Sequence, residues 1–245
     1  MSEVALLSFA TMKKQNSQNT FLTGKSTCCM HQGVLMKIGL IMENSQAAKN
    51  ALVYEELSNV AKANGHEVIN FGMYSSEDKR CLTYVMNGLL SALVLNCKVV
   101  DFVVTGCGTG EGACLACNAF PGVQCGHVTN PVDAYLFTQV NGGNAIALPY
   151  AQNFGWGGEL NLRYTFEKLF VSPFGGGYPV ERREPEQRNA RILTEVKAIT
   201  HRPLIDILKD LDRDFVKTTI DDPKFAELFY PNCADDEIAA FLKSL

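Results

Sequence analysis

The residues best suited to chemistry lie in one stretch, residues 99–122 (VVDFVVTGCGTGEGACLACNAFPG). An apolar run leads into Cys107, a helical pattern follows from residue 112, and glycines stand at Gly106, Gly108, Gly110 and Gly112. Glycines let the backbone approach a ligand closely, and the N–H groups at a helix start can hold a phosphate or stabilise an oxyanion. The same field favours the thiolate form of a cysteine placed there. Cys107 is therefore a candidate base or nucleophile.

Other groups compete with Cys107 or accompany it. Glu43 follows the first apolar strand, where an acid would face the ligand crevice of a parallel sheet and orient a hydroxyl or act as the acid. Glu111, inside the turn, either shares the proton transfer or complements the helix dipole, and we favour the dipole. Cys114 and Cys117 form a CxxC that lacks a second pair at zinc spacing, so two packing residues are expected. His127, in an apolar strand, is expected to be a core residue.

The elements around this turn alternate between strand and helix patterns, which predicts a doubly wound parallel sheet. We expect an α/β fold, a three-layer αβα sandwich with a Rossmann-like sheet of five strands at 36–42, 66–74, 99–106, 122–129 and 142–150. Helices are expected at 45–65, 82–96, 112–119, 131–140 and 155–171. Residues 36–178 would form this domain, and 179–245 a helical extension with too few apolar residues for its own core. For residues 1–35 we expect a disordered or non-native tail, with a mitochondrial presequence as the alternative.

At this point the sequence resembles a known family. The start Met36-Lys37-Ile38, the segment HEVINFGMYSSED, the turn CGTGEG with Asn118 and PGV after it, the segment 141–144 and the GGG-to-arginine stretch occur in the order found in type B ribose-5-phosphate isomerases and galactose-6-phosphate isomerase subunits. The resemblance covers roughly residues 36–190.

The resemblance implies an aldose–ketose isomerase without metal or organic cofactor, acting on a phosphorylated sugar. In the family, a cysteine at the position of Cys107 moves a proton between C1 and C2 of an open-chain sugar phosphate, and the turn, including Thr109, stabilises the enediolate. From the resemblance and the residues together, the predicted catalytic set is Cys107, Thr109 and Glu43. The predicted substrate-binding set is Asn44, Gly108, Gly110, Glu111, Gly112, Asn141, Arg182 and Arg188. Arg188 and Arg191 are alternatively surface residues paired with nearby glutamates. Sites in this family borrow residues from a neighbour, so a homodimer or a dimer of dimers is expected.

Departures from the family pattern bear on the substrate. Glu43-Asn44 replaces an Asp-His pair, Val140 stands where the ring-opening histidine is expected, and Tyr178 occupies the position of a phosphate arginine. These changes suit a substrate that is already acyclic, such as a tetrose phosphate, or one whose ring is opened by another group, so ribose 5-phosphate itself is not the expected substrate.

Composition limits the other possibilities. The net charge of −4 gives no basic footprint for nucleic acid, and no apolar run is long enough to span a membrane. With no secretory signal and nine cysteines, an odd number, we expect reduced thiols and a cytoplasmic protein. Two alternatives remain: a non-catalytic sugar-phosphate-binding or regulatory protein, and a thiol redox protein using Cys107 or the CxxC.

Overall fold

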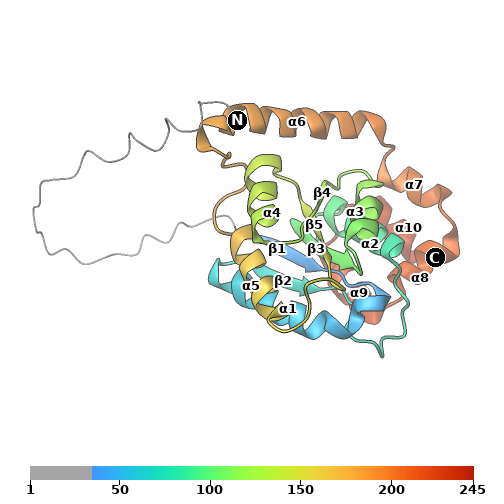
Figure 1. Cartoon of the computed structure of the whole chain (residues 1–245). Coiled ribbons are helices and arrows are strands. Elements are labelled where there is room, and N and C mark those ends of the chain that lie inside the picture. Colours follow the sequence, from blue (N-terminus) through green and yellow to red (C-terminus); the bar gives the residue numbers. More distant parts are fainter. Residues whose placement is uncertain (1–34) are drawn as a thin grey trace, which may run out of the picture. The chain divides into compact units, whose positions relative to one another are not determined.

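The structure is a computed structural model that describes residues 35–245 (Figure 1). The expectation for the tail falls on residues 1–34, outside this part. Five parallel strands form one sheet in the order β2-β1-β3-β5-β4. The strands are β1 (Lys37–Leu40), β2 (Glu67–Asn70), β3 (Phe102–Cys107), β4 (Cys125–His127) and β5 (Ala145–Pro149). The predicted α/β sandwich with a five-stranded parallel sheet is confirmed.

Helices cover both faces of the sheet. One face carries α1 (Asn50–Ala63), α4 (Pro131–Leu136) and α5 (Gly158–Leu169), whose apolar side chains share a core with β1, β3 and β5. The other face carries α2 (Tyr84–Asn96) and α3 (Glu111–Asn118). A 3-10 turn, η2 (Asn44–Lys49), precedes α1, and a π-helical segment, η3 (Phe137–Asn141), follows α4. The single predicted helix at 131–140 thus divides into α4 and η3.

The C-terminal helices add a further layer over α2. They are α7 (Leu204–Asp210), α8 (Arg213–Ile220), α9 (Pro223–Phe229) and α10 (Asp236–Lys243). Their buried side chains, including Leu208, Val216, Phe225 and Phe229, belong to the same apolar cluster as α2. Because α2 lies between the sheet and these helices, residues 87–95 are buried all round, which explains why this helix is apolar on every side.

Helix α6 (Arg183–Thr200), preceded by the 3-10 turn η4 (Val180–Arg182), differs from the other helices (Figure 1). None of its residues is buried. It contacts η3, and its Lys197 ammonium donates to the carbonyl of Asn118 at 3.1 Å. The predicted division of the chain at 178/179 stays a prediction. No helix within residues 35–245 has the length and apolarity that crossing a membrane requires.

Candidate active site

Cys107 is the last residue of β3, so it lies at the carboxyl edge of the sheet. The chain leaves β1 toward β2 on one side and returns as β3 on the other, and ligands of such folds bind where the strand order reverses. Backbone bonds fix the Cys107 position, because Tyr150 N–H donates to the Cys107 carbonyl and Ala151 N–H to the Gly108 carbonyl, both at 2.9 Å. The Cys107 residue is 8% exposed. The thiol is thus held at the reversal point with limited access to water.

Two glycines of the turn are required by close packing. A Cβ on Gly106 would lie 2.5 Å from the Tyr150 ring, and one on Gly110 would lie 2.7 Å from the His127 ring. Gly110 also has a φ of +79°, in the left-handed region that favours glycine, and it is the N-cap of α3. The first N–H groups of a helix have no intrahelical partner. The turn therefore presents backbone donors and the positive end of the α3 dipole beside Cys107.

His127, at the carboxyl end of β4, braces this turn. Its Nε2 lies 2.9 Å from the Thr109 carbonyl oxygen, and its Nδ1 lies 3.2 Å from a Glu111 carboxylate oxygen. Both partners are acceptors, so only the doubly protonated ring donates to both at once. The expectation that His127 is a core residue is wrong, because the ring contacts the turn and is partly exposed. Its place at the end of a parallel strand was the signal that could have identified it.

Glu43 and Asn44 lie where β1 leads into η2. The Glu43 carboxylate accepts a hydrogen bond from Ser45 N at 3.0 Å and another from the Ser45 hydroxyl, so it caps η2. Glu43 is only 4% exposed. The Asn44 amide is exposed and lies 3.0 Å from the Cys81 sulfur. Glu43 thus has a structural partner for each oxygen, and its predicted catalytic role stays a prediction.

Gln46 and Lys49, which the sequence analysis did not single out, also lie at this edge. A Cβ built on Gly108 would be 3.9 Å from Gln46 Nε2, so this amide borders the turn. The Lys49 ammonium donates to Gln46 Oε1 at 2.8 Å and to the Tyr150 carbonyl, and it lies 4.4 Å from the Phe154 ring centroid. Burial lowers the pKa of Lys49. An amide and a partly desolvated cation therefore stand next to the glycine-rich turn.

Asn141, Arg182 and Arg188 are not brought to Cys107 within one chain. Asn141 ends η3 just before β5, at the amino edge of the sheet, whereas Cys107 pairs with Pro149 at the other end of β5. About 13 Å of strand separates these edges. Arg182 ends η4 and Arg188 is an exposed residue of α6, which contacts η3 at the same amino edge. Within one chain these three residues lie away from Cys107, and their predicted part in substrate binding stays a prediction.

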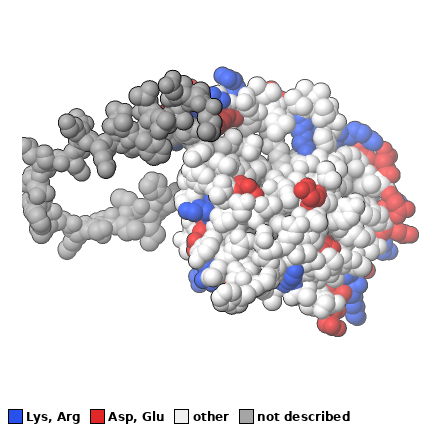
Figure 2. All heavy atoms as spheres, viewed as in Figure 1, with Lys and Arg blue, Asp and Glu red and all other residues white. Residues whose placement is uncertain are grey.

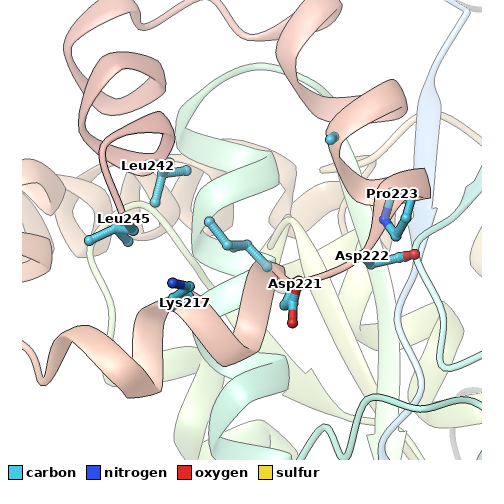
Figure 3. A pocket seen from close by; sticks show the side chains of 8 residues that line it. Lys217, Asp221, Asp222, Pro223, Leu242 and Leu245 are labelled. Carbon is cyan, nitrogen blue, oxygen red and sulfur yellow. The ribbon is translucent and has the colours of Figure 1, made fainter.

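Cys107 does not line either of two hollows on the surface of the described part. One, of about 340 Å³, lies among α8, α9 and α10 and is lined by residues such as Lys217, Asp221 and Leu242 (Figure 3). The other, also about 340 Å³, lies at the amino edge between β4 and α6, with Asn141 and Lys197 in its wall. On the face seen in Figure 2, charged side chains are scattered among uncharged ones. Within residues 35–245 no group of three or more His, Cys, Asp or Glu side chains is placed to hold a metal ion.

Comparisons with known proteins show the family of the chain. Residues 38–173 match the family model described as Ribose/Galactose Isomerase, and residues 199–245 match one described as Ribose-5-phosphate isomerase. The chain belongs to the ribose/galactose isomerase family. A solved 4-deoxy-L-threo-5-hexosulose-uronate ketol-isomerase, complexed with a tartrate, is 60% identical with a TM-score of 0.83, covering 85% of this chain and 98% of its own. A ribose-5-phosphate isomerase from Vibrio parahaemolyticus is 51% identical with a TM-score of 0.83, covering 86% and 99%.

More distant members of the family share the fold alone. A type B ribose-5-phosphate isomerase from Trypanosoma cruzi is 18% identical with a TM-score of 0.55, and it covers 66% of this chain and 98% of its own. Comparison with curated proteins gave no match. Family membership makes the chain an isomerase of the aldose–ketose type.

Proposed function

We propose that this isomerase moves a proton between neighbouring carbons of an open-chain sugar derivative, with the Cys107 thiolate as the base. The thiolate removes the proton from the carbon beside the carbonyl, the C–H electron pair forms the C=C bond of the enediolate, and the carbonyl electrons move to oxygen. A proton passes from the hydroxyl oxygen to the former carbonyl oxygen, and the thiol returns its proton to the former carbonyl carbon while the new C=O bond forms on its neighbour. The observation that carries the proposal is the Cys107 sulfur at the strand-order reversal beside a turn of backbone donors.

Stabilisation of the enediolate falls to the glycine-rich turn and its neighbours. Donors aimed at a developing oxyanion in a water-poor site lower the barrier more than the same donors in water. The N–H groups at Gly108 to Gly112 and the Thr109 side chain are the proposed donors, and His127 fixes the turn that carries them. Gln46 and Lys49 lie close enough to the turn to orient an anionic or hydroxyl group of the substrate.

For the substrate we propose an acyclic ketol with an anionic end group, and not ribose 5-phosphate itself. Val140 stands where the resembled family has its ring-opening histidine, so a compound that needs no ring opening fits this chain better. The anionic group is either a phosphate or a carboxylate. Phosphate is the first candidate. Carboxylate is the second, because the chain is 60% identical to a uronate ketol-isomerase and a uronate carries a carboxylate and no phosphate.

The test is isotope exchange in heavy water with a panel of compounds. Four-, five- and six-carbon sugar phosphates and 4-deoxy-L-threo-5-hexosulose-uronate are incubated with the enzyme, and deuterium beside the carbonyl is followed by NMR. We expect exchange and turnover for at least one acyclic compound, loss of both in Cys107→Ser, and no loss in Cys81→Ser, which removes an exposed thiol. Exchange that persists in Cys107→Ser would overturn the assignment of the base.

We propose that a complete site, with both Cys107 and Asn141, forms only where two copies of the chain meet. Asn141, Arg182 and Arg188 lie at the amino edge, so a substrate on Cys107 meets them only if a second copy presents that edge. Helix α6 offers an apolar surface for such a contact, with Ile192, Leu193, Val196 and Ile199 between 47% and 84% exposed. The proposed assembly is therefore a homodimer with shared sites.

Mixing two inactive variants tests the shared sites. If Cys107→Ser and Asn141→Ala affect the same composite site from different chains, their mixed dimer retains one intact site. Random mixing then restores about a quarter of wild-type activity, because half of the dimers are mixed and each has one intact site of two. No recovery after verified subunit exchange would refute the shared site while leaving the role of Cys107 untouched.

A further inference from the structure

Three thiols that the proposed reaction does not use gather between α3 and β4. Cys114 and Cys117 lie one turn apart on α3, and Cys125 begins β4. All seven cysteines within residues 35–245 are free. Cys114 and Cys125 are half-buried, whereas Cys117 is fully buried. We call these three residues the α3–β4 thiol cluster.

The side chain of Asn118 holds two of these residues together. Its amide donates to the carbonyls of Cys125 at 2.8 Å and Cys114 at 3.1 Å, and its oxygen accepts from Cys125 N at 3.0 Å. The Cys114 sulfur then lies 3.4 Å from the Cys125 carbonyl oxygen. Cys125 also lines the hollow beside α6, so a small solute can reach this side of the cluster.

The thiols of the chain differ in acidity. A hydrogen bond from the Cys125 thiol outweighs burial and, with the charge of His127, lowers the pKa of Cys114 to about 7. Cys97 and Cys233 form a second pair of neighbouring thiols. There the shift has the opposite direction, because burial and a hydrogen bond with Cys233 raise the pKa of Cys97. A half-buried thiol whose pKa lies near neutral, next to a second thiol, matches the environment of peroxide-reactive cysteines.

We propose that Cys114 and Cys125 form a hydroperoxide-sensitive disulfide site, with Cys114 as the attacking thiol and Cys125 as the resolving one. The Cys114 thiolate attacks a peroxide oxygen, an S–O bond forms, the O–O bond breaks, and hydroxide or alkoxide leaves. The Cys125 sulfur then attacks the Cys114 sulfur, the S–S bond forms, and the hydroxyl leaves as water with the Cys125 proton. Two thiols lose two electrons, and the hydroperoxide gains them.

Oxidation at this site would reach the glycine-rich turn. Cys114 lies one helical turn after Glu111, and Cys125 lies two residues before His127. His127 in turn contacts Glu111 and the Thr109 carbonyl. A covalent link between α3 and β4 therefore restrains both sides of this brace, and we expect the oxidised enzyme to isomerise more slowly. This consequence rests on the proposed function, whereas formation of the disulfide does not.

The experiment maps thiols in the full-length enzyme after treatment with a small excess of hydrogen peroxide at neutral pH. Remaining thiols are alkylated, and the chain is cleaved with thermolysin, which cuts on the amino side of apolar residues such as Ala116 and Val123 and so separates Cys114, Cys117 and Cys125. Cross-linked peptides are then sequenced by mass spectrometry. We expect a Cys114–Cys125 link that dithiothreitol reverses. It should form faster than a Cys97–Cys233 link, because the pKa of Cys114 is lowered whereas burial raises the pKa of Cys97.

Variants sharpen the result. Cys114→Ser and Cys125→Ser should each abolish the link, and Cys97→Ser should leave it unchanged. Mapping of the wild-type enzyme decides the question even where a variant fails to fold. A dominant Cys114–Cys117 link, overoxidation of Cys114 without any link, or equally rapid Cys97–Cys233 oxidation would each overturn the proposal.

Discussion

Substitution of Gly110 by alanine tests how the glycine-rich turn is built. The added Cβ would lie 2.7 Å from the His127 ring and 3.0 Å from the Leu148 carbonyl carbon, at a φ of +79°. The left-handed conformation costs an alanine about 1–2 kcal/mol. Inserting a methyl group into a packed contact costs about 1–3 kcal/mol more. We therefore expect Gly110→Ala to lower the free energy of unfolding by roughly 2–5 kcal/mol.

A matched control separates the two costs. Gly142 also has a positive φ, +60°, but a Cβ there would meet nothing within 4 Å. Gly142→Ala should therefore show the conformational cost of about 1–2 kcal/mol alone. The free energy of unfolding is measured by urea denaturation followed by circular dichroism. In the Gly110→Ala enzyme, turnover should also fall, because the His127 ring must leave the Thr109 carbonyl to make room for the methyl group.

The contact with His127 can be isolated by a double-mutant cycle. In a His127→Ala background the ring is gone, so Gly110→Ala should lose most of the packing penalty and approach the cost of Gly142→Ala. If Gly110→Ala costs the same in both backgrounds, or no more than Gly142→Ala, then the ring does not pack against Gly110 as the structure indicates.

Three further predictions concern stability. Arg80→Met should lower the free energy of unfolding by about 3–5 kcal/mol in urea denaturation, because it leaves two carboxylates, Asp78 and Asp222, only 11% and 12% exposed and unpaired; unchanged stability would contradict this. Burial opposes the ionisation of Asp78, yet backbone N–H groups and the Arg80 guanidinium lower its pKa. Ionised Asp78 therefore stabilises the fold above pH about 4, and this stabilisation is lost as the pH falls through the pKa of the folded carboxylate. Asp78→Asn should lower the free energy of unfolding at neutral pH, and the difference from the wild type should vanish in acid. Tyr150→Phe removes a buried hydroxyl that has no partner within residues 35–245, so thermal denaturation should show unchanged or slightly higher stability.

Much of the fold could be predicted because its parts have local signals. The alternation of apolar strands and amphipathic helices indicated the parallel sheet, and the all-apolar pattern of α2 follows from its burial on both sides. Boundaries were less accurate where context decides them. β4 is a three-residue edge strand paired only with β5, so the predicted strand at 122–129 was too long.

The site was only partly predictable because it is assembled by topology. Cys107 and the turn are contiguous in sequence, so a strand-to-helix pattern was enough to find them. His127, Gln46 and Lys49 come from other strand ends and connections, and only the strand order brings them to the turn. These three residues belong to no sequence motif or periodic pattern that would have marked them as part of the site.

The sheet edge at which Asn141 lies could have been deduced from its place relative to the predicted strands. A residue just before a parallel strand lies at the amino edge of the sheet, and a residue that ends a parallel strand lies at the carboxyl edge. Asn141 precedes β5 and Cys107 ends β3, so no loop movement of a few residues joins them across about 13 Å of strand. If both act on one substrate, the second must come from another copy of the chain. Activity regained on mixing Cys107→Ser with Asn141→Ala would therefore report the sheet topology and the assembly together.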